Sequence, residues 1–103
     1  MLVRTLRQEE NVNKFIMFHG LECPHCRRMM PIVDKLAAET GVAVEKLEVW
    51  HNDKNADLMR SYKPVIGPKC GGQLRTPTFF NPETGDVLCG EVDYEKLKEW
   101  AAR

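Results

Sequence analysis

Residues 19–36 read HGLECPHCRRMMPIVDKL, and within them two cysteines, Cys23 and Cys26, stand three positions apart. Such a pair is compatible with three kinds of site: a redox dithiol, half of a metal site, or a structural cross-link. Which of them applies depends on the local structure around the pair and on the other cysteines of the chain.

The cysteine pair is expected at the junction between a buried strand and a helix. The apolar run 13–19, NKFIMFH, predicts the strand. Pro24 suits the first turn of the following helix, because the N–H that proline lacks would have no acceptor there. Apolar residues then recur at helical spacing as far as Gly41, a typical helix end. Pro31 lies inside this helix and is expected to kink it.

The remaining elements predict a mixed α/β fold. Strands are expected at 42–50, 77–81 and 86–92, helices at 53–62 and after Asp93 as N-cap, and a Pro- and Gly-rich loop at 63–75. This β-α-β-α-β-β-α order predicts a four-stranded sheet with a parallel βαβ unit, an antiparallel final hairpin and helices on both faces. All 103 residues are expected to form one domain, with 1–12 as a loose N-terminal segment.

Apolar side chains of the second helix and the two tryptophans are expected to face the core. In the second helix these are Leu58, Met59 and Tyr62, while Trp50 and Trp100 are expected as core or partly buried anchors.

The composition argues against several classes of function. The 15 basic and 15 acidic residues balance, which gives no electrostatic basis for binding nucleic acid or an anionic membrane. No apolar run is long enough to span a bilayer, and the N-terminal sequence lacks the pattern of a secretory signal. We therefore expect a cytoplasmic protein, in which four cysteines indicate reactivity or metal binding rather than a disulfide scaffold.

The expected position of Cys23 at a helix start favours its thiolate. Unpaired N–H groups and the helix dipole stabilise an anion there, so the pKa of Cys23 should fall. His25 adds a donor or a positive charge, whereas Glu22 places a negative charge beside the thiolate. Because the thiolate is the attacking species in disulfide exchange, Cys23 is the expected nucleophile and Cys26, one turn further on, the resolving thiol.

A second chemical element is the tripeptide TPT at 76–78, which opens a predicted strand. A cis Thr76–Pro77 bond would turn the chain sharply. It would leave the backbone groups of Thr76 able to pair with an extended substrate, as in strand addition.

Together these features resemble the thioredoxin superfamily over roughly residues 13–102. The resemblance rests on C-P-H-C at 23–26, on Pro31 five residues later, on the strand-opening T-P-T and on the element order. It implies a thioredoxin fold with Cys23 and Cys26 as redox pair, Pro77 as the adjacent cis-proline, and Pro24 and His25 as residues that tune the pair. The C-P-H-C form is similar to that of bacterial thiol oxidases, whose intervening histidine stabilises the reduced state.

The sequence departs from this family at several positions. Glu22 stands where thioredoxins carry a tryptophan, and Met17 stands where they carry a buried acid that helps proton transfer from the second thiol. The expected elements are closer to the minimal glutaredoxin-like form. Glutaredoxins bind glutathione with paired glycines near the last helix, and here Gly90 is single. Glutathione is therefore left open as a co-substrate.

The other two cysteines have less specific interpretations. Cys89 is expected as a small core residue or an inert surface thiol, and Cys70 as an exposed loop thiol, either incidental, redox-active or glutathionylated. Half of a zinc or iron–sulfur site remains the alternative for Cys23 and Cys26, although no second C-x-x-C is present. His51, at the start of a loop, is assigned no role.

The sequence thus predicts a glutaredoxin- or thioredoxin-like thiol–disulfide oxidoreductase acting through Cys23 and Cys26. Thr76, Pro77 and Glu22 are the expected substrate-binding residues, and no metal or cofactor is expected. The expected partners are a disulfide-containing protein or small molecule, and a reductase or glutathione for recycling, with the enzyme a monomer. The alternative is a non-enzymatic module of the same fold that binds a metal or protein partner through the same cysteines.

Overall fold

A mixed four-stranded sheet forms the centre of the structure, a computed structural model that describes residues 15–103. The strands are β1 (Phe15–His19), β2 (Val44–Glu48), β3 (Thr78–Asn81) and β4 (Asp86–Cys89), in the order β2-β1-β3-β4. β1 pairs with β2 in parallel, and β3 pairs antiparallel with both β1 and β4. The predicted βαβ unit and final hairpin are confirmed, with strands shorter than expected. The expected loose segment 1–12 lies outside the described residues.

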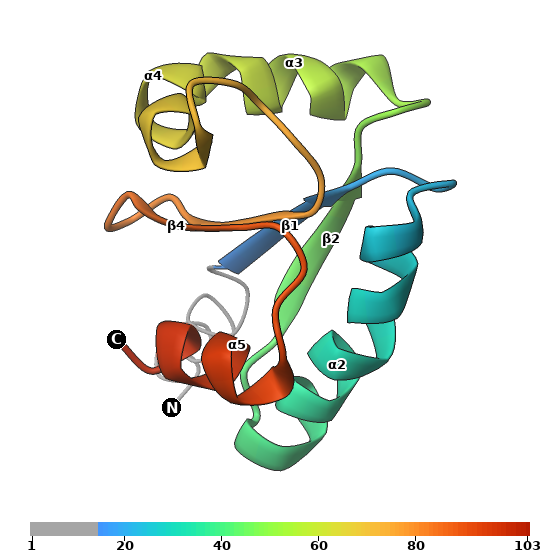
Figure 1. Cartoon of the computed structure of the whole chain (residues 1–103), viewed down its shortest axis with the longest axis vertical. Helices are drawn as coiled ribbons and strands as arrows, with labels where there is room; N and C mark the ends of the chain where they lie inside the picture. Colours follow the sequence, from blue (N-terminus) through green and yellow to red (C-terminus); the bar gives the residue numbers. More distant parts are fainter. Residues whose placement is uncertain (1–14) are drawn as a thin grey trace, which may run out of the picture.

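Helices cover both faces of this sheet, as predicted. They are α2 (Pro24–Thr40), α3 (Asp53–Ser61), α4 (Lys63–Ile66) and α5 (Tyr94–Ala101), with a 3₁₀ turn η1 (Gly67–Cys70) after α4. In Figure 1, α3 and α4 lie above the sheet, and α2 and α5 lie below it. No helix within residues 15–103 has both the length and the apolar character needed to cross a membrane.

Local signals in the sequence set the helix ends. Gly41 ends α2 with a φ of 78°, and its N–H donates to the Ala37 carbonyl. Asn52 and Asp93 cap α3 and α5, each accepting a hydrogen bond from a backbone N–H three residues later. α2 continues through Pro31. The predicted Gly41 stop and Asp93 cap are thereby confirmed.

β1 supplies side chains to two apolar cores, one on each face of the sheet. Phe15 and Met17 belong to the core between the sheet and helices α2 and α5, whereas Ile16 and Phe18 belong to the core between the sheet and helices α3 and α4. This alternation explains why the strand reads as an uninterrupted apolar run, because both of its faces are buried. The run ends at the edge of the sheet from which the chain enters α2.

Three expectations about residues 50–70 were wrong. The segment 63–70 folds as α4 and η1 instead of an open loop, because Pro64 and Pro68 occupy first-turn positions that tolerate proline. Leu58 is 37% exposed, whereas its neighbour Met59 is buried. Trp50 is 50% exposed and lies against Gly20, where a side chain would collide with the indole.

Cys70 and Cys89 form a disulfide between η1 and β4, with their Cα atoms 5.7 Å apart. The interpretation of Cys70 as an exposed loop thiol was therefore wrong, since η1 buries it. Cys89 is likewise neither a free core residue nor a free surface thiol. The disulfide anchors the segment that leads, six residues after Cys70, to Thr76.

Candidate active site

Cys23 is the N-cap of α2 and lies at the junction predicted from the sequence. Its N–H donates to the Gly20 carbonyl at 3.1 Å, which closes the turn after β1. Its Sγ accepts a hydrogen bond from the N–H of Cys26 at 3.2 Å. Both thiols are free, and Cys23 is 3% exposed whereas Cys26 is fully enclosed. A sulfur that takes the place of a capping oxygen is well placed to carry negative charge.

The two thiols have opposite acidities. Burial raises the pKa of Cys23, but hydrogen bonds from the thiol of Cys26, the hydroxyl of Thr76 and the backbone N–H groups of Cys26 and His25 outweigh burial and lower it overall. Burial and the hydrogen bond to Cys23 raise the pKa of Cys26 to about 11. At neutral pH the pair is therefore arranged as one acidic sulfur beside one protonated thiol.

Thr76 and Pro77 lie next to Cys23, although 53 positions separate Thr76 from it. The hydroxyl of Thr76 donates to Cys23 Sγ at 3.5 Å, and the Thr76 carbonyl oxygen lies 3.9 Å from the same sulfur. The Thr76–Pro77 peptide bond is cis, and Pro77 is fully buried. The structure thus brings together four of the predicted site residues: Cys23, Cys26, Thr76 and Pro77.

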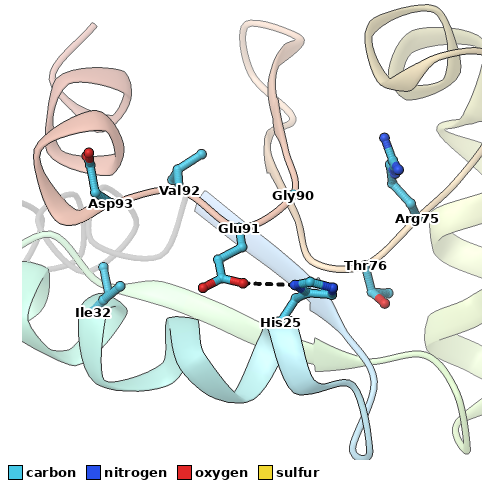
Figure 2. A pocket seen from close by; sticks show the side chains of 8 residues that line it. All are labelled: His25, Ile32, Arg75, Thr76, Gly90, Glu91, Val92 and Asp93. Carbon is cyan, nitrogen blue, oxygen red and sulfur yellow. Dashed lines mark hydrogen bonds and ion pairs between the residues drawn. The ribbon is translucent and has the colours of Figure 1, made fainter.

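The His25 side chain contacts a residue that the sequence did not single out, Glu91. His25 Nδ1 lies 2.8 Å from Glu91 Oε1, and the Arg28 Nε donates to both carboxylate oxygens at 2.9 and 3.0 Å. Figure 2 shows Glu91 reaching from the segment after β4 toward His25 on α2. The hydrogen bonds from Arg28 and then His25 lower the pKa of Glu91 to about 2. Pro24 is the first residue of α2, as predicted.

Glu22 is bound to a histidine on another loop. Its carboxylate lies 2.7 Å from His51 Nε2, and this contact raises the pKa of His51. The expectation that His51 has no role was incomplete, because it forms this ion pair across two loops. Glu48 supports the same loops, since its carboxylate accepts hydrogen bonds from the N–H groups of Leu21, Trp50 and His51.

Two surface cavities share Thr76, which contacts Cys23. One of about 690 Å³ is lined by residues that include His25, Glu91 and Asp93 (Figure 2), and one of about 370 Å³ is lined by residues that include Trp50 and Met59. Thr76 and Arg75 line both cavities. The guanidinium of Arg75 has no hydrogen-bond or ion-pair partner among residues 15–103. A group larger than a single side chain could therefore lie across Thr76 and reach both cavities.

Metal ligation has little support around the pair. Within the described residues, no group of three or more His, Cys, Asp or Glu side chains is close enough to hold a metal ion. Cys70 and Cys89, the only further cysteines, are bonded to each other.

Glu91 and Arg75 are the functional candidates that sequence reasoning missed. Glu91 lies 63 positions from Arg28 and 66 from His25. Arg75 precedes the T-P-T tripeptide and carries no motif of its own. The one available signal was their proximity in sequence to positions already of interest, Gly90 and Thr76.

Comparison with solved structures supports the fold assignment. Desulfothioredoxin from Desulfovibrio vulgaris Hildenborough superimposes with a TM-score of 0.61 and 25% identity, covering 85% of this chain and 77% of that one. A glutaredoxin from Archaeoglobus fulgidus gives a TM-score of 0.62 at 18% identity, covering 91% of both chains. Thioredoxin from Trypanosoma brucei brucei gives 0.56 at 15% identity, covering 95% of this chain and 81% of that one.

No protein-family model and no curated protein sequence matches this chain. The assignment therefore rests on the sheet order, the helices on both faces and the strand-to-helix position of the Cys23–Cys26 pair. These are also the features that the sequence pattern predicted. The chain has the thioredoxin fold, and the match to desulfothioredoxin at 25% identity supports its assignment to the thioredoxin superfamily.

Proposed function

We propose that this protein is a thiol–disulfide oxidoreductase in which Cys23 is the nucleophile and Cys26 the resolving thiol. The observation that carries the proposal is the unequal pair at the start of α2. The lowered pKa of Cys23 makes its sulfur reactive, and the raised pKa of Cys26 keeps the second thiol protonated until it is needed. The two sulfurs are already in hydrogen-bond contact.

The reaction proceeds by two exchanges that balance. The Cys23 thiolate attacks a substrate disulfide, forms a Cys23–substrate mixed disulfide and releases one substrate thiolate, which takes up a proton. Cys26 then loses its proton and attacks Cys23 Sγ, which forms the Cys23–Cys26 disulfide and releases the second substrate thiol. The protein loses two electrons and the Cys26 proton, the substrate gains two electrons and two protons, and solvent supplies the second proton. The same steps in reverse oxidise a dithiol substrate.

We propose that the substrate binds across Thr76, in contact with the two cavities. The Thr76 N–H has no acceptor among the described residues, so it is available to pair with an extended backbone. Pro77 shapes this segment, whereas Glu22, bound to His51, borders the site rather than pointing into it. A disulfide-containing polypeptide or a small disulfide such as oxidised glutathione fits this arrangement.

We further propose a monomeric cytoplasmic protein that is recycled by glutathione or a reductase. A persistent disulfide such as Cys70–Cys89 is rare in reducing compartments. The redox state of these two cysteines in cells therefore tests the location directly. A fully reduced Cys70–Cys89 pair would agree with the cytoplasm, and a fully oxidised pair would contradict it.

Cysteine variants assayed by dithiol-driven insulin reduction test the function. We expect Cys23→Ser to abolish activity, and Cys26→Ser to accumulate a mixed disulfide visible as an added mass. A Cys70→Ser/Cys89→Ser variant, checked for folding by circular dichroism, is the control and should retain activity. Cys23→Ser activity equal to wild type would overturn the proposal. Stoichiometric zinc that is lost on chelation would favour the metal-binding module instead.

A further inference from the structure

Glu91 holds the side chains of His25 and Arg28, which lie on the first turns of α2 after Cys23. Its carboxylate bonds Arg28 through both oxygens and His25 through one, at 2.8 to 3.0 Å. The Glu91 side chain is 33% exposed, against 60% for His25 and 56% for Arg28. Glu91 is thus the most enclosed of the three side chains. Figure 2 shows its side chain extending from the segment after β4 toward α2.

Arg28 lies where its charge acts on Cys23, and His25 contacts the same sulfur through its backbone. The backbone N–H of His25 donates a hydrogen bond to Cys23 Sγ. The His25 side chain therefore belongs to a residue that directly contacts this sulfur. Arg28, one turn further along α2, interacts electrostatically with Cys23. Positive charge at this place stabilises the thiolate, which is the reduced form, and therefore makes the disulfide more oxidising.

We propose that Glu91 is a positioning residue that makes the Cys23–Cys26 disulfide less oxidising, by binding His25 and Arg28 and partly neutralising the charge of Arg28. The inference rests on the proposed redox function and addresses the direction of exchange, which the C-P-H-C motif alone leaves open. Glu91 touches neither substrate nor sulfur. It acts through Arg28 and His25, so its removal should change the redox equilibrium without removing the chemistry.

The other charged groups near Cys23 in the sequence have different contacts. The Arg27 Nε donates to the Leu21 carbonyl at 3.1 Å. Glu22, beside it in sequence, is paired with His51. Arg75, from the segment before Thr76, lines the shared cavities and has no partner among the described residues. Cys26 stays protonated to about pH 11. Glu91 is therefore the carboxylate in direct contact with Arg28, the α2 cation that interacts electrostatically with Cys23.

The expected change is modest because these groups are partly solvated. Glu91→Gln keeps the shape and one acceptor oxygen but removes the negative charge. We expect the equilibrium between protein disulfide and two glutathiones, giving protein dithiol and glutathione disulfide, to shift about threefold toward the dithiol. At 29.6 mV per tenfold change, threefold corresponds to about 14 mV in reduction potential.

The experiment measures this equilibrium constant, the acidity of Cys23 by alkylation against pH, and thermal stability. Wild type is compared with Glu91→Gln, Arg28→Gln and the remote charge control Glu83→Gln, which lies in the β3–β4 turn. We expect Glu91→Gln to be more oxidising than wild type, Arg28→Gln to be less oxidising, and Glu83→Gln to be unchanged. Both substitutions remove the same contact between α2 and the segment after β4, so a purely structural effect would shift the equilibrium constant of both variants in the same direction. Shifts of opposite sign would therefore indicate an effect of charge.

Three outcomes would overturn the inference. In the first, Glu91→Gln and Arg28→Gln both lower thermal stability but leave the equilibrium constant with glutathione as in wild type. Glu91 would then only hold α2 to the segment after β4. Both could shift the constant in the same direction, which would contradict the charge effect even if one variant folds poorly. If wild type forms no Cys23–Cys26 disulfide in any glutathione buffer, the proposed function fails and this inference fails with it.

Discussion

Thr76→Val should raise the pKa of Cys23. The substitution replaces a hydroxyl by a methyl group of similar size and keeps a β-branched side chain, so the segment before Pro77 need not move. It removes the donor that lies 3.5 Å from Cys23 Sγ. The remaining donors, the thiol of Cys26 and the backbone N–H groups of Cys26 and His25, stay in place.

The size of the effect follows from the geometry. A hydrogen bond to a charged group contributes about 1.5–3 kcal/mol, and the 3.5 Å contact to sulfur argues for the lower end of that range. About 1.4 kcal/mol corresponds to about one pKa unit. At a pH below both pKa values the thiolate fraction then falls about tenfold. Intrinsic nucleophilicity rises with pKa, so the rate of attack should fall only about three- to fourfold.

Thiolate absorbance at 240 nm, followed against pH in the reduced protein, measures this shift, and alkylation of Cys23 at fixed pH measures the rate. Thr84→Val, in the β3–β4 turn, is the matched control and should leave both unchanged. A pKa of Cys23 that stays constant or falls in folded Thr76→Val would refute the reasoning, because the hydroxyl would then contribute nothing to the thiolate.

The remaining predictions concern titration and stability. Glu22→Gln should return the raised pKa of His51 toward 6.5. The stability that the pair contributes is present below pH 6.5 and is lost as the pH rises through the folded-state pKa of His51, so the variant should lack this pH dependence. An unchanged NMR titration of His51 would contradict the ion pair. The reduced protein should lose stability in urea melts as the pH rises from about 8.5 to about 11. Cys26 ionises near the lower value in the unfolded chain and near the upper value in the folded protein. Cys26→Ala should reduce this pH dependence of stability. Replacing Cys70 and Cys89 by alanine should cost about 3 kcal/mol for a 19-residue separation; urea melts with and without reductant check this, and equal stability would argue against the cross-link.

Much of the fold could be predicted because its signals are local. The apolar run ending at His19, the proline at position 24 and the glycine at 41 act on neighbouring backbone, and they placed Cys23 at a helix start. The Asp93 cap worked for the same reason. Once the order of elements was known, parallel and antiparallel pairing followed from the lengths of the connections.

Prediction was wrong where the same residue types serve two structures. Proline and glycine in 63–72 indicated a loop, but each proline falls in the first turn of a short helical segment, where it is equally acceptable. Trp50 was expected as a core or partly buried anchor, yet it is half exposed and covers Gly20 at the surface. Neighbouring residues in the sequence decide neither whether the proline- and glycine-rich segment is helical nor whether Trp50 is buried.

The sequence by itself determined the strand-to-helix junction, the identity of the cysteine pair and the expectation of a thioredoxin fold, since each depends on residues within a few positions or on element order. Only the tertiary structure decided which charges meet. With 15 basic and 15 acidic residues, the chain allows many pairings, and Glu91 with His25 and Arg28 is one that folding selects. The Cys70–Cys89 disulfide was settled in the same way, because chain folding, rather than spacing, brings the two sulfurs together.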